Sequence, residues 1–291
     1  MSVKILILGG DGMLGHQLLE YFNSRYSVWV TLRSDTSKYR SYANFNSKNA
    51  LFEVEASICE GFEKIIADIK PDVVINCVGI VRQRKEAEDA VESIKINSLL
   101  PHQLSVVCAK NNARLIHVST DCVFSGKEGS YVESDIPDAT DIYGRSKLLG
   151  EVTTGNSITL RTSIIGLELS RKQGLIEWFL AQRGTIKGYS NAIFTGFTTR
   201  ELAFILEVLI TQHPGLSGLW HVSSNPISKY QLLTDLAMKL NRKDIEIIED
   251  KEFQCDRSLD GSKFTLATGY IPPSWDEMLD KLAAQIKNQK I

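Results

Sequence analysis

Cysteine is scarce in this 291-residue sequence, and its spacing carries no known pattern. The five cysteines are odd in number, widely separated and without a C-x-x-C pair: Cys59, Cys77, Cys108, Cys122 and Cys255. This pattern indicates neither a disulfide framework nor a zinc site. No other ligand cluster shows metal spacing, so no metal ligands are assigned and a metal requirement stays open. The reducing cytoplasm is the expected location.

The sequence also lacks a charge excess of one sign and a long hydrophobic run. Lys and Arg total 33 against 35 Asp and Glu, for a net charge of -2, and no block of five basic residues occurs. Nucleic acid is therefore not an expected partner. The first apolar run, Val3 to Leu8, is too short to span a bilayer and lacks the cleavage site of a secretory signal. No membrane association is expected.

Short apolar runs alternate with helical spacing along much of the chain. Five further strands are predicted after the first run, at 28–32, 73–78, 115–118, 158–160 and 219–222. Leu14, Leu18 and Phe22 recur at helical spacing directly after the first strand. Strands that alternate with helices predict a parallel sheet covered on both faces. The fold class is α/β.

The pattern is less regular after Gly166, which predicts a second, smaller lobe. Helices are expected at 175–182 and 201–210, after Ser228, and after the capping-box sequence Ser274 to Glu277. We assign 1–166, with about 192–224, to a cofactor-binding domain, and 167–291 mainly to a substrate-binding lobe. No repeat or long linker separates the two.

A glycine-rich loop joins the first strand to the first helix. Gly9, Gly12 and Gly15 recur at intervals of three, and Met13 and Leu14 lie between the second and third of these glycines. Backbone without Cβ atoms can approach a pyrophosphate at the positive end of a helix. Because the strand and helix supply the required context, the loop predicts a dinucleotide site rather than an ordinary tight turn.

The end of the second predicted strand indicates which nicotinamide cofactor fits. An acidic residue at this position accepts hydrogen bonds from the adenosine ribose in NAD-selective folds. Here Arg33 and Ser34 occupy it, and a guanidinium can hold a 2′-phosphate. NADPH is therefore favoured. Asp35 lies nearby, so NADH stays open, as does a solvated loop role for Arg33.

Three residues suit the reduction of a ketone. Tyr143 and Lys147 lie four residues apart, on one face of a helix, and Thr120 follows the strand at 115–118. The lysine charge lowers the pKa of a phenol that would otherwise titrate near 10. Tyr143 is then the acid, Lys147 its activator and a ribose ligand, and Thr120 the group that orients the carbonyl.

These motifs resemble those of the extended short-chain dehydrogenase/reductases, within them the dTDP-4-dehydrorhamnose reductase group. The likeness runs almost end to end. It includes the glycine loop, the stretches 71–76, 96–98, 119–126, 143–151 and 160–163, and the C-terminal stretches 257–260 and 273–275. It implies a Rossmann-type doubly wound sheet with a smaller C-terminal lobe. The implied enzyme is an oxidoreductase that uses NADPH to reduce the 4-keto group of a nucleotide-activated deoxy-sugar, in surface polysaccharide or deoxy-sugar biosynthesis, and a homodimer is compatible with it.

The resemblance also implies roles for further residues. Asn97 supports Lys147 through a water, and the segment after the fourth strand lines the cofactor: Asn76, Cys77, Val78 and Gly79. Candidate substrate residues follow Thr120 or lie in the second lobe: Arg82, Asp121, Cys122, Val123, Trp178, Gly196, Phe197 and Thr198. Trp178 and Phe197 can equally be core aromatics.

Alternative functions stay open. The basic stretch Arg82 to Lys85 departs from the acidic pattern of the group, which leaves the sugar undefined. A dehydratase is disfavoured because Cys122 replaces the glutamate of those relatives. An epimerase or epimerase-reductase could use that thiol, although no histidine occurs at 165–169 to assist it. A non-catalytic NADP-binding subunit, as in methionine adenosyltransferase, need not keep all three catalytic residues, which are intact here.

Overall fold

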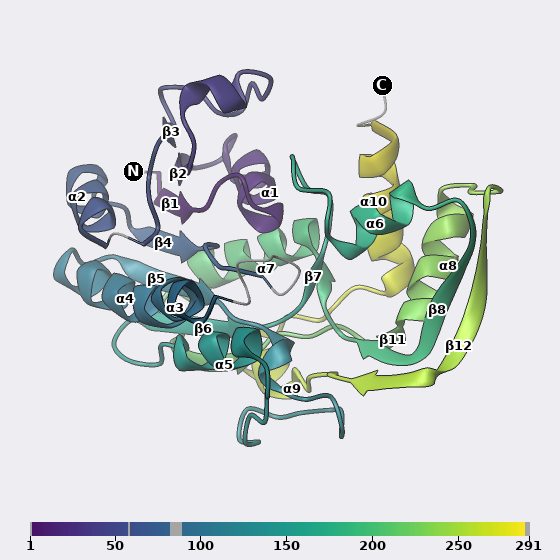
Figure 1. Ribbon diagram of the computed structural model, residues 1–291. Helices are drawn as coiled ribbons and strands as arrows, with labels where there is room; N and C mark the ends of the chain where they lie inside the picture. The colour runs from purple at the N-terminus through teal and green to yellow at the C-terminus, as the bar shows by residue number, and fades with distance from the viewer. Residues whose placement is uncertain (1, 58, 82–88, 289–291) are drawn as a thin grey trace. The chain divides into compact units, whose positions relative to one another are not determined.

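The computed structural model describes residues 2–57, 59–81 and 89–288 of the chain (Figure 1). The strands are β1 Lys4–Leu8, β2 Ser27–Thr31, β3 Ala50–Leu51, β4 Val73–Asn76, β5 Arg114–Val118, β6 Ser157–Arg161, β7 Ile164–Ile165, β8 Gly184–Phe194, β9 Phe197–Thr198, β10 Gly218–His221, β11 Ile227–Ser228 and β12 Ile245–Asp256. The α-helices are α1 Met13–Phe22, α2 Cys59–Ile69, α3 Ala90–Ser93, α4 Leu100–Lys110, α5 Ile142–Leu149, α6 Leu175–Ala181, α7 Thr199–Thr211, α8 Lys229–Lys239, α9 Ser262–Thr268 and α10 Trp275–Asn288. Three short helices, η1 Thr36–Tyr39, η3 Ile94–Leu99 and η4 Asp121–Val123, complete the order.

Seven strands form the main sheet in the order β10-β6-β5-β4-β1-β2-β3. Neighbouring strands from β3 through β6 are paired in parallel. The chain builds outward from β1 in one direction and from β4 in the other, so the strand order reverses between these two strands. Ligands of doubly wound sheets bind at such a reversal, beyond the carboxyl ends of the strands. The predicted α/β fold class is confirmed.

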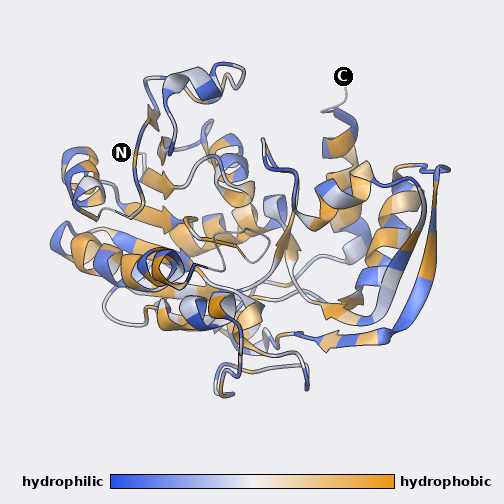
Figure 2. Cartoon of the chain, in the orientation of Figure 1, coloured by the Kyte–Doolittle hydropathy of each residue, from blue (hydrophilic) through white to orange (hydrophobic). Residues whose placement is uncertain are grey.

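The strands of this sheet are apolar because both of its faces are covered. Figure 2 shows β1 and β4 as mostly hydrophobic. On one face, Leu6, Val74 and Leu115 pack with Phe62 of α2 and Leu104 of α4 in a fully buried cluster. Helix α1 is tied to the later part of α7 by polar contacts. The burial of these apolar faces is the main source of stability for the sheet.

A partly buried polar cluster around Glu207 joins α7 to the end of α1 and to the residues that follow it. Its carboxylate accepts hydrogen bonds from Tyr21 at 2.9 Å and Tyr26 at 2.8 Å, and it pairs with Arg25 at 2.8 Å. Burial and the carboxylate raise the pKa of Tyr26 to about 12. The two tyrosines therefore stay neutral donors at any physiological pH.

The chain divides into two compact units. Unit 1 comprises residues 1–120, 140–160 and 203–219, and unit 2 comprises 121–139, 161–202 and 220–291. Unit 2 contains a three-stranded sheet in the order β11-β8-β12, in which β12 is parallel to β8 and β11 is antiparallel to it. The long strands β8 and β12 were not expected from the sequence. Most of β12 is hydrophilic (Figure 2), as befits a solvent-facing edge strand.

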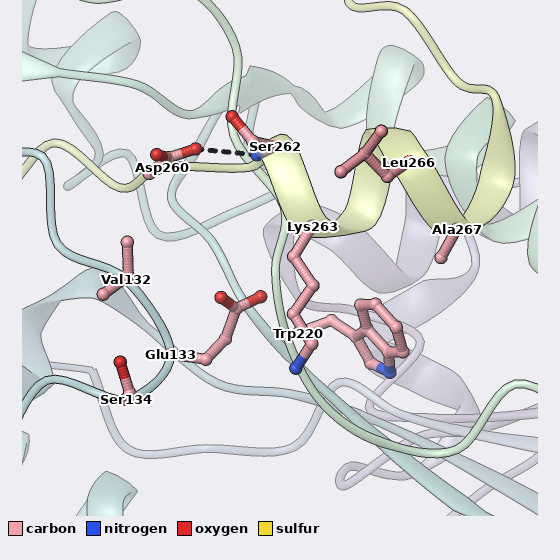
Figure 3. Close-up of a pocket in the computed structure, with 9 residues that line it drawn as sticks. All are labelled: Val132, Glu133, Ser134, Trp220, Asp260, Ser262, Lys263, Leu266 and Ala267. Atoms are coloured by element: carbon pink, nitrogen blue, oxygen red, sulfur yellow. Dashed lines mark hydrogen bonds between the residues drawn. The ribbon is translucent and has the colours of Figure 1, made fainter.

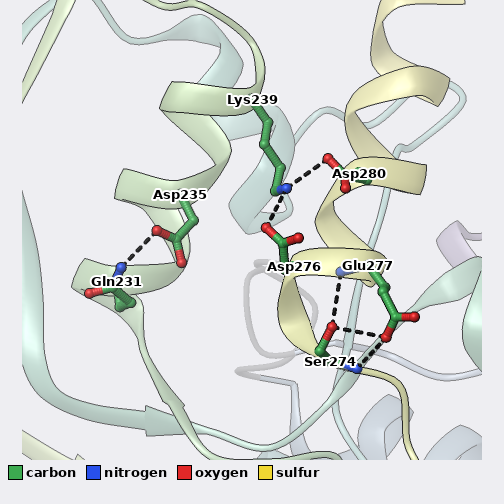
Figure 4. Close-up of polar contacts among 7 residues, drawn as sticks. All are labelled: Gln231, Asp235, Lys239, Ser274, Asp276, Glu277 and Asp280. Carbon is green, nitrogen blue, oxygen red and sulfur yellow. Dashed lines mark hydrogen bonds and ion pairs between the residues drawn. The ribbon is translucent and has the colours of Figure 1, made fainter.

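The helix starts predicted in the C-terminal region are confirmed. Ser228 caps α8 by accepting a hydrogen bond from the backbone N–H of Gln231 at 3.1 Å. Ser274 and Glu277 form the capping box of α10, in which the glutamate accepts from the Ser274 backbone at 2.9 Å (Figure 4). Over the described ranges, none of the helices has both the length and the apolar composition needed to cross a membrane.

Candidate active site

The glycine loop lies at the point where the strand order of the main sheet reverses. Gly9 has a φ of +82°, a conformation that favours glycine, and its carbonyl accepts from the Gly12 N–H at 3.1 Å. A Cβ on Gly15 would overlap with the Gly9 carbonyl, because helix α1 starts directly against the loop. Gly12 is the N-cap of α1 and contributes no capping side chain. The loop therefore presents bare backbone at the positive end of a helix.

This loop fits the pyrophosphate of a dinucleotide. A Cβ at Gly9 would lie 3.2 Å from the Cγ2 of Val78, so a side chain there would fill the space between the ends of β1 and β4. Met13 and Leu14 form the first turn of α1, whose backbone N–H groups have no partner within a helix. Such N–H groups and the helix dipole together stabilise phosphate oxygens.

The end of β2 lies against the glycine loop, and two basic side chains follow it in the sequence. Thr31 accepts from the Gly9 N–H at 3.1 Å through its hydroxyl, and from the Gly10 N–H at 2.8 Å through its carbonyl. Arg33 is exposed two residues later. Lys38 of η1 donates to the Ser34 hydroxyl at 3.2 Å. The sequence pattern had indicated Arg33 but not Lys38, which only the turn of η1 brings back to Ser34.

Asn76 ends β4 and fixes the backbone that follows it. Its Oδ1 accepts from the Val78 N–H at 3.1 Å, and its Nδ2 lies 3.1 Å from Nδ1 of His117 on β5. Both side chains are buried. Burial, the Lys147 charge and His102 lower the pKa of His117 well below its usual range, so its ring is neutral. Because the Asn76 amide donates, the proton of this ring is on Nε2.

The next two candidate cofactor residues are Cys77 and Gly79. Burial raises the pKa of the Cys77 thiol to about 12, so the thiol is an unreactive group that lines the site. Gly79 lies close to Asn97, whose Oδ1 would be 3.3 Å from a Cβ at this position. The predicted cofactor segment is thus small and tightly supported.

Asn97 lies in the π-helical segment η3, a distortion often found at functional sites. Its Oδ1 accepts from the Ile80 N–H at 2.9 Å, and its Nδ2 donates to the Ile80 carbonyl at 3.0 Å and to the Ser146 hydroxyl at 3.1 Å. Asn97 therefore joins the end of β4 to helix α5. The water predicted between Asn97 and Lys147 stays a prediction.

Helix α5 carries both Tyr143 and Lys147. Asp141 caps it by accepting from the Gly144 N–H at 2.8 Å. Lys147 is 5% exposed and donates to the carbonyl of Val118 at 2.8 Å, at the end of β5. Thr120 follows two residues later and is also buried. The structure therefore ties the tyrosine and lysine helix to the strand end that bears the threonine.

The charge of Lys147 is set by opposing effects. The pKa of Lys147 is lowered to about 8 because the effect of burial exceeds the raising effects of the Glu151 carboxylate and the Cys77 sulfur. Glu151 accepts a hydrogen bond from the Ser119 hydroxyl at 2.9 Å. No role for Ser119 or Glu151 was predicted from the sequence, although both belong to the motifs that resemble the reductase group.

The candidate substrate residues fall in different settings. Asp121, Cys122 and Val123 form the short helix η4, in which Asp121 and Val123 are buried and Cys122 is partly exposed. Arg82 lies outside the described residues. Trp178 on α6 is 39% exposed. These positions stay predictions for a substrate site.

The segment Gly196 to Thr198 is interior to unit 2. A Cβ at Gly196 would overlap with the Ser163 carbonyl, and Phe197 is fully buried with an edge contact to Tyr270. Thr198 accepts from the Glu201 N–H at 3.3 Å at the start of α7. This burial indicates a packing function for the Phe197 side chain, the alternative that the sequence had left open.

Unit 2 also has a surface cavity of about 640 Å³ (Figure 3). It is lined by Val132, Glu133, Ser134, Trp220, Asp260, Ser262, Lys263, Leu266 and Ala267. The Lys263 ammonium lies 4.5 Å from the centroid of the Trp220 ring. Glu133 accepts from the His221 N–H at 2.9 Å, and Asp260 accepts from the Ser262 N–H at 2.7 Å. These contacts fasten α9 and the 131–134 segment to β10.

The part of the chain that the structure describes contains no group of three or more His, Cys, Asp or Glu residues placed to hold a metal ion. The polar groups assembled in unit 1 instead suit a dinucleotide and a proton transfer. The glycine loop, the β4 end and α5 all meet the carboxyl edge of the main sheet.

Comparison with known proteins agrees with this geometry. A dTDP-4-dehydrorhamnose reductase from Aggregatibacter actinomycetemcomitans is 28% identical over 235 residues, which cover 77% of this chain and 74% of the relative. The β subunit of methionine adenosyltransferase 2 from Xenopus laevis is 32% identical over 151 residues, 52% of this chain and 42% of that protein. The second match spans less than half of its relative.

A solved structure of a reductase has the same fold as this chain. The crystal structure of dTDP-4-dehydrorhamnose reductase from Bacillus anthracis in complex with NADP superposes with a TM-score of 0.80 at 20% identity, covering 98% of this chain and all of that one. The family model described as the RmlD substrate binding domain matches residues 3–288. The resemblance predicted from the sequence motifs is confirmed: this chain belongs to the RmlD substrate binding domain family.

Proposed function

We propose that the protein is an NADPH-dependent reductase of the 4-keto group of a nucleotide-activated deoxy-sugar. The observation that carries the proposal is the placement of Lys147. Its ammonium is buried and bonded to Val118 at the strand end that bears Thr120, and it is one helical turn from Tyr143. The similarity to reductases named for dTDP-4-dehydrorhamnose supports the class of substrate.

The residues of the chain divide the reaction between them. Thr120 orients the carbonyl oxygen, and Tyr143 gives that oxygen a proton. Lys147 stabilises the phenolate that remains, since its positive charge is held in a low-dielectric site. NADPH, when bound, supplies the hydride, so that the ketone becomes a secondary alcohol and the cofactor becomes NADP⁺.

The glycine loop and the end of β2 are proposed to hold the cofactor. The bare backbone of Gly9 to Gly15 suits the pyrophosphate, and Arg33 with Lys38 suits the 2′-phosphate that distinguishes NADPH from NADH. NADP in the Bacillus anthracis reductase agrees with this choice. NADH remains the weaker alternative. Homodimer formation and a cytoplasmic location also stay predictions.

The test is a screen of nucleotide-linked 4-keto-deoxy-sugars with NADPH oxidation as the readout. We expect turnover with at least one of them, and a loss of about 100-fold or more in Tyr143→Phe, because general-acid catalysis contributes that much. NADPH binding should be retained, since the ring stays. A Tyr143→Phe variant with near-normal turnover would contradict the mechanism.

Tyr189→Phe is the matched control, because Tyr189 contacts Phe253 in the three-stranded sheet of unit 2. It should turn over like the unmodified protein. The same screen separates the alternatives. A non-catalytic NADP-binding subunit would bind NADPH and oxidise none of it, and an epimerase would interconvert sugars without net consumption. Deuterium from heavy water at C3 or C5 of the product would indicate an epimerase-reductase that uses Cys122.

A further inference from the structure

Two consecutive residues at the end of β5 form hydrogen bonds with two side chains of opposite charge. The Val118 carbonyl accepts from the Lys147 ammonium at 2.8 Å, and the Ser119 hydroxyl donates to Glu151 at 2.9 Å. Lys147 and Glu151 are four residues apart, and the next residue of the strand end is Thr120. The positive and the negative side chain are thus fixed to the same short segment of backbone.

The backbone after α5 directs Glu151 to this position. The helix ends at Leu149, but the Gly150 and Glu151 N–H groups still donate to the Lys147 and Leu148 carbonyls, each at 3.1 Å. Gly150 lies so close to Asn97 that a Cβ would overlap with the Asn97 carbonyl. This contact permits the final turn to lie against η3, and it brings the glutamate to Ser119 rather than to solvent.

The groups that act on Lys147 come from three elements. His117 on β5 is neutral, because burial holds its pKa well below the usual range. The Cys77 thiol after β4 is protonated, because burial raises its pKa to about 12. Among the described residues that shift the pKa of Lys147, Glu151 is the carboxylate, and it acts to raise that pKa.

We propose that Glu151 is a positioning residue that, held by Ser119, keeps the buried Lys147 ammonium charged and in place for Tyr143. A lysine that is 5% exposed loses most of the hydration of its ammonium, and a nearby carboxylate favours the charged form. The effect on turnover rests on the proposed function. The effect on the ionisation of Lys147 does not, because it follows from the structure of unit 1 alone.

The primary experiment measures Lys147 directly. Protein labelled at lysine Cε is titrated by NMR, and the Lys147 signal is identified by its loss in Lys147→Arg. In Glu151→Gln we expect the midpoint of this signal to move to lower pH by about one unit, the size expected for removal of a neighbouring opposite charge. An unchanged midpoint would overturn the proposal.

The kinetic experiment follows kcat/KM for NADPH-dependent reduction against pH. Lys147 is charged below its pKa, so activity is lost as pH rises through that value. In Glu151→Gln the descending limb should move to lower pH by the same amount as the NMR midpoint. A limb that stays in place while overall turnover falls would indicate a purely structural role and overturn the proposal.

Further variants keep the test decisive. Glu151→Asp retains the charge and should return both midpoints toward the unmodified protein; equal shifts in Asp and Gln variants would count against an electrostatic role. Ser119→Ala should give a smaller shift in the same direction, and it decides the matter if Glu151→Gln does not fold. Glu92→Gln, which removes a carboxylate paired with Lys95 on the surface, should change neither midpoint. A shifted NMR midpoint without turnover would refute the proposed function and leave this inference intact.

Discussion

The polar contacts at the carboxyl edge of the main sheet and those between α8 and α10 differ in how deeply they are buried. At the carboxyl edge of the main sheet, Asn76, Asn97 and Lys147 are each 5% exposed or less and are bonded to backbone groups. Between α8 and α10 in unit 2, Lys239 pairs with Asp276 and Asp280, which are 79% and 64% exposed (Figure 4). Burial strengthens an electrostatic interaction and makes the loss of one partner costly.

These two kinds of contact serve different purposes. Buried groups fix atoms where the cofactor and the reacting carbonyl are proposed to lie, and their neighbours cannot move to accommodate a change. Exposed pairs orient helices that are already held by apolar packing, here through buried Leu236 and Leu279. Substitutions should therefore have large effects at the sheet edge and small effects at the α8–α10 surface.

The largest effect is expected for Gly150→Ala. Its φ of -91° suits alanine, so any loss comes from the overlap of the new Cβ with the Asn97 carbonyl. We expect unfolding to become easier by about 3 kcal/mol or more, the upper range for overpacking. Gly61→Ala is the control, because Gly61 lies in α2 with open space around it and should gain about 0.5 to 1 kcal/mol. Urea unfolding measures both, and equal effects would contradict the assigned contact.

The next effect tests the cofactor end of the sheet edge. Arg33→Ala should weaken NADPH binding by about 1.5 to 3 kcal/mol and NADH binding by much less, since a charged hydrogen bond to the 2′-phosphate is lost. Titration of both cofactors gives the answer. Arg183→Ala, which removes an exposed pair with Asp244 in unit 2, is the control and should leave both affinities unchanged. Equal losses for the two cofactors would assign Arg33 to solvent.

A smaller effect concerns the acid stability of unit 1. His117 has a folded-state pKa well below that of the unfolded chain. Below pH 6.5 the unfolded state therefore takes up a proton that the folded state does not, and stability falls as the pH falls. One such proton contributes a slope of up to about 1.4 kcal/mol per pH unit. His117→Gln should have a shallower decline in urea midpoint between pH 6.5 and 5, and an unchanged decline would contradict a buried neutral ring.

The smallest effect is expected at the α8–α10 surface. The carboxylates of Asp276 and Asp280 raise the pKa of Lys239, so the pairing is present at neutral pH and is lost only as the pH rises through that raised value. Lys239→Met should lower the urea midpoint only slightly, and high salt should remove the difference. A loss as large as that of Gly150→Ala would end the distinction between the two regions.

The sequence by itself determined the features that depend on local spacing. Alternating apolar runs and helical repeats predicted most strands of the main sheet, since β1, β2, β4, β5 and β6 each bury a short apolar run, but they did not predict the two-residue strand β3. The glycine spacing predicted a loop that touches the start of α1, and Ser228 and Ser274 predicted two helix starts. Such signals are encoded within a few residues of the structure that they specify.

Only the tertiary structure decided the contacts between distant segments. The pairing of β8 with β12 joins Gly184 to Ile245, and β12 is mostly polar and interrupted by a register shift, so no regular alternation identified it. The π-helical turn at Asn97 and the bond from Ser119 to Glu151 likewise depend on how α5 and η3 lie against the sheet. The sequence motifs include these residues. Which side chain balances the charge of Lys147 depends on distance and burial, and both are set only when the chain has folded.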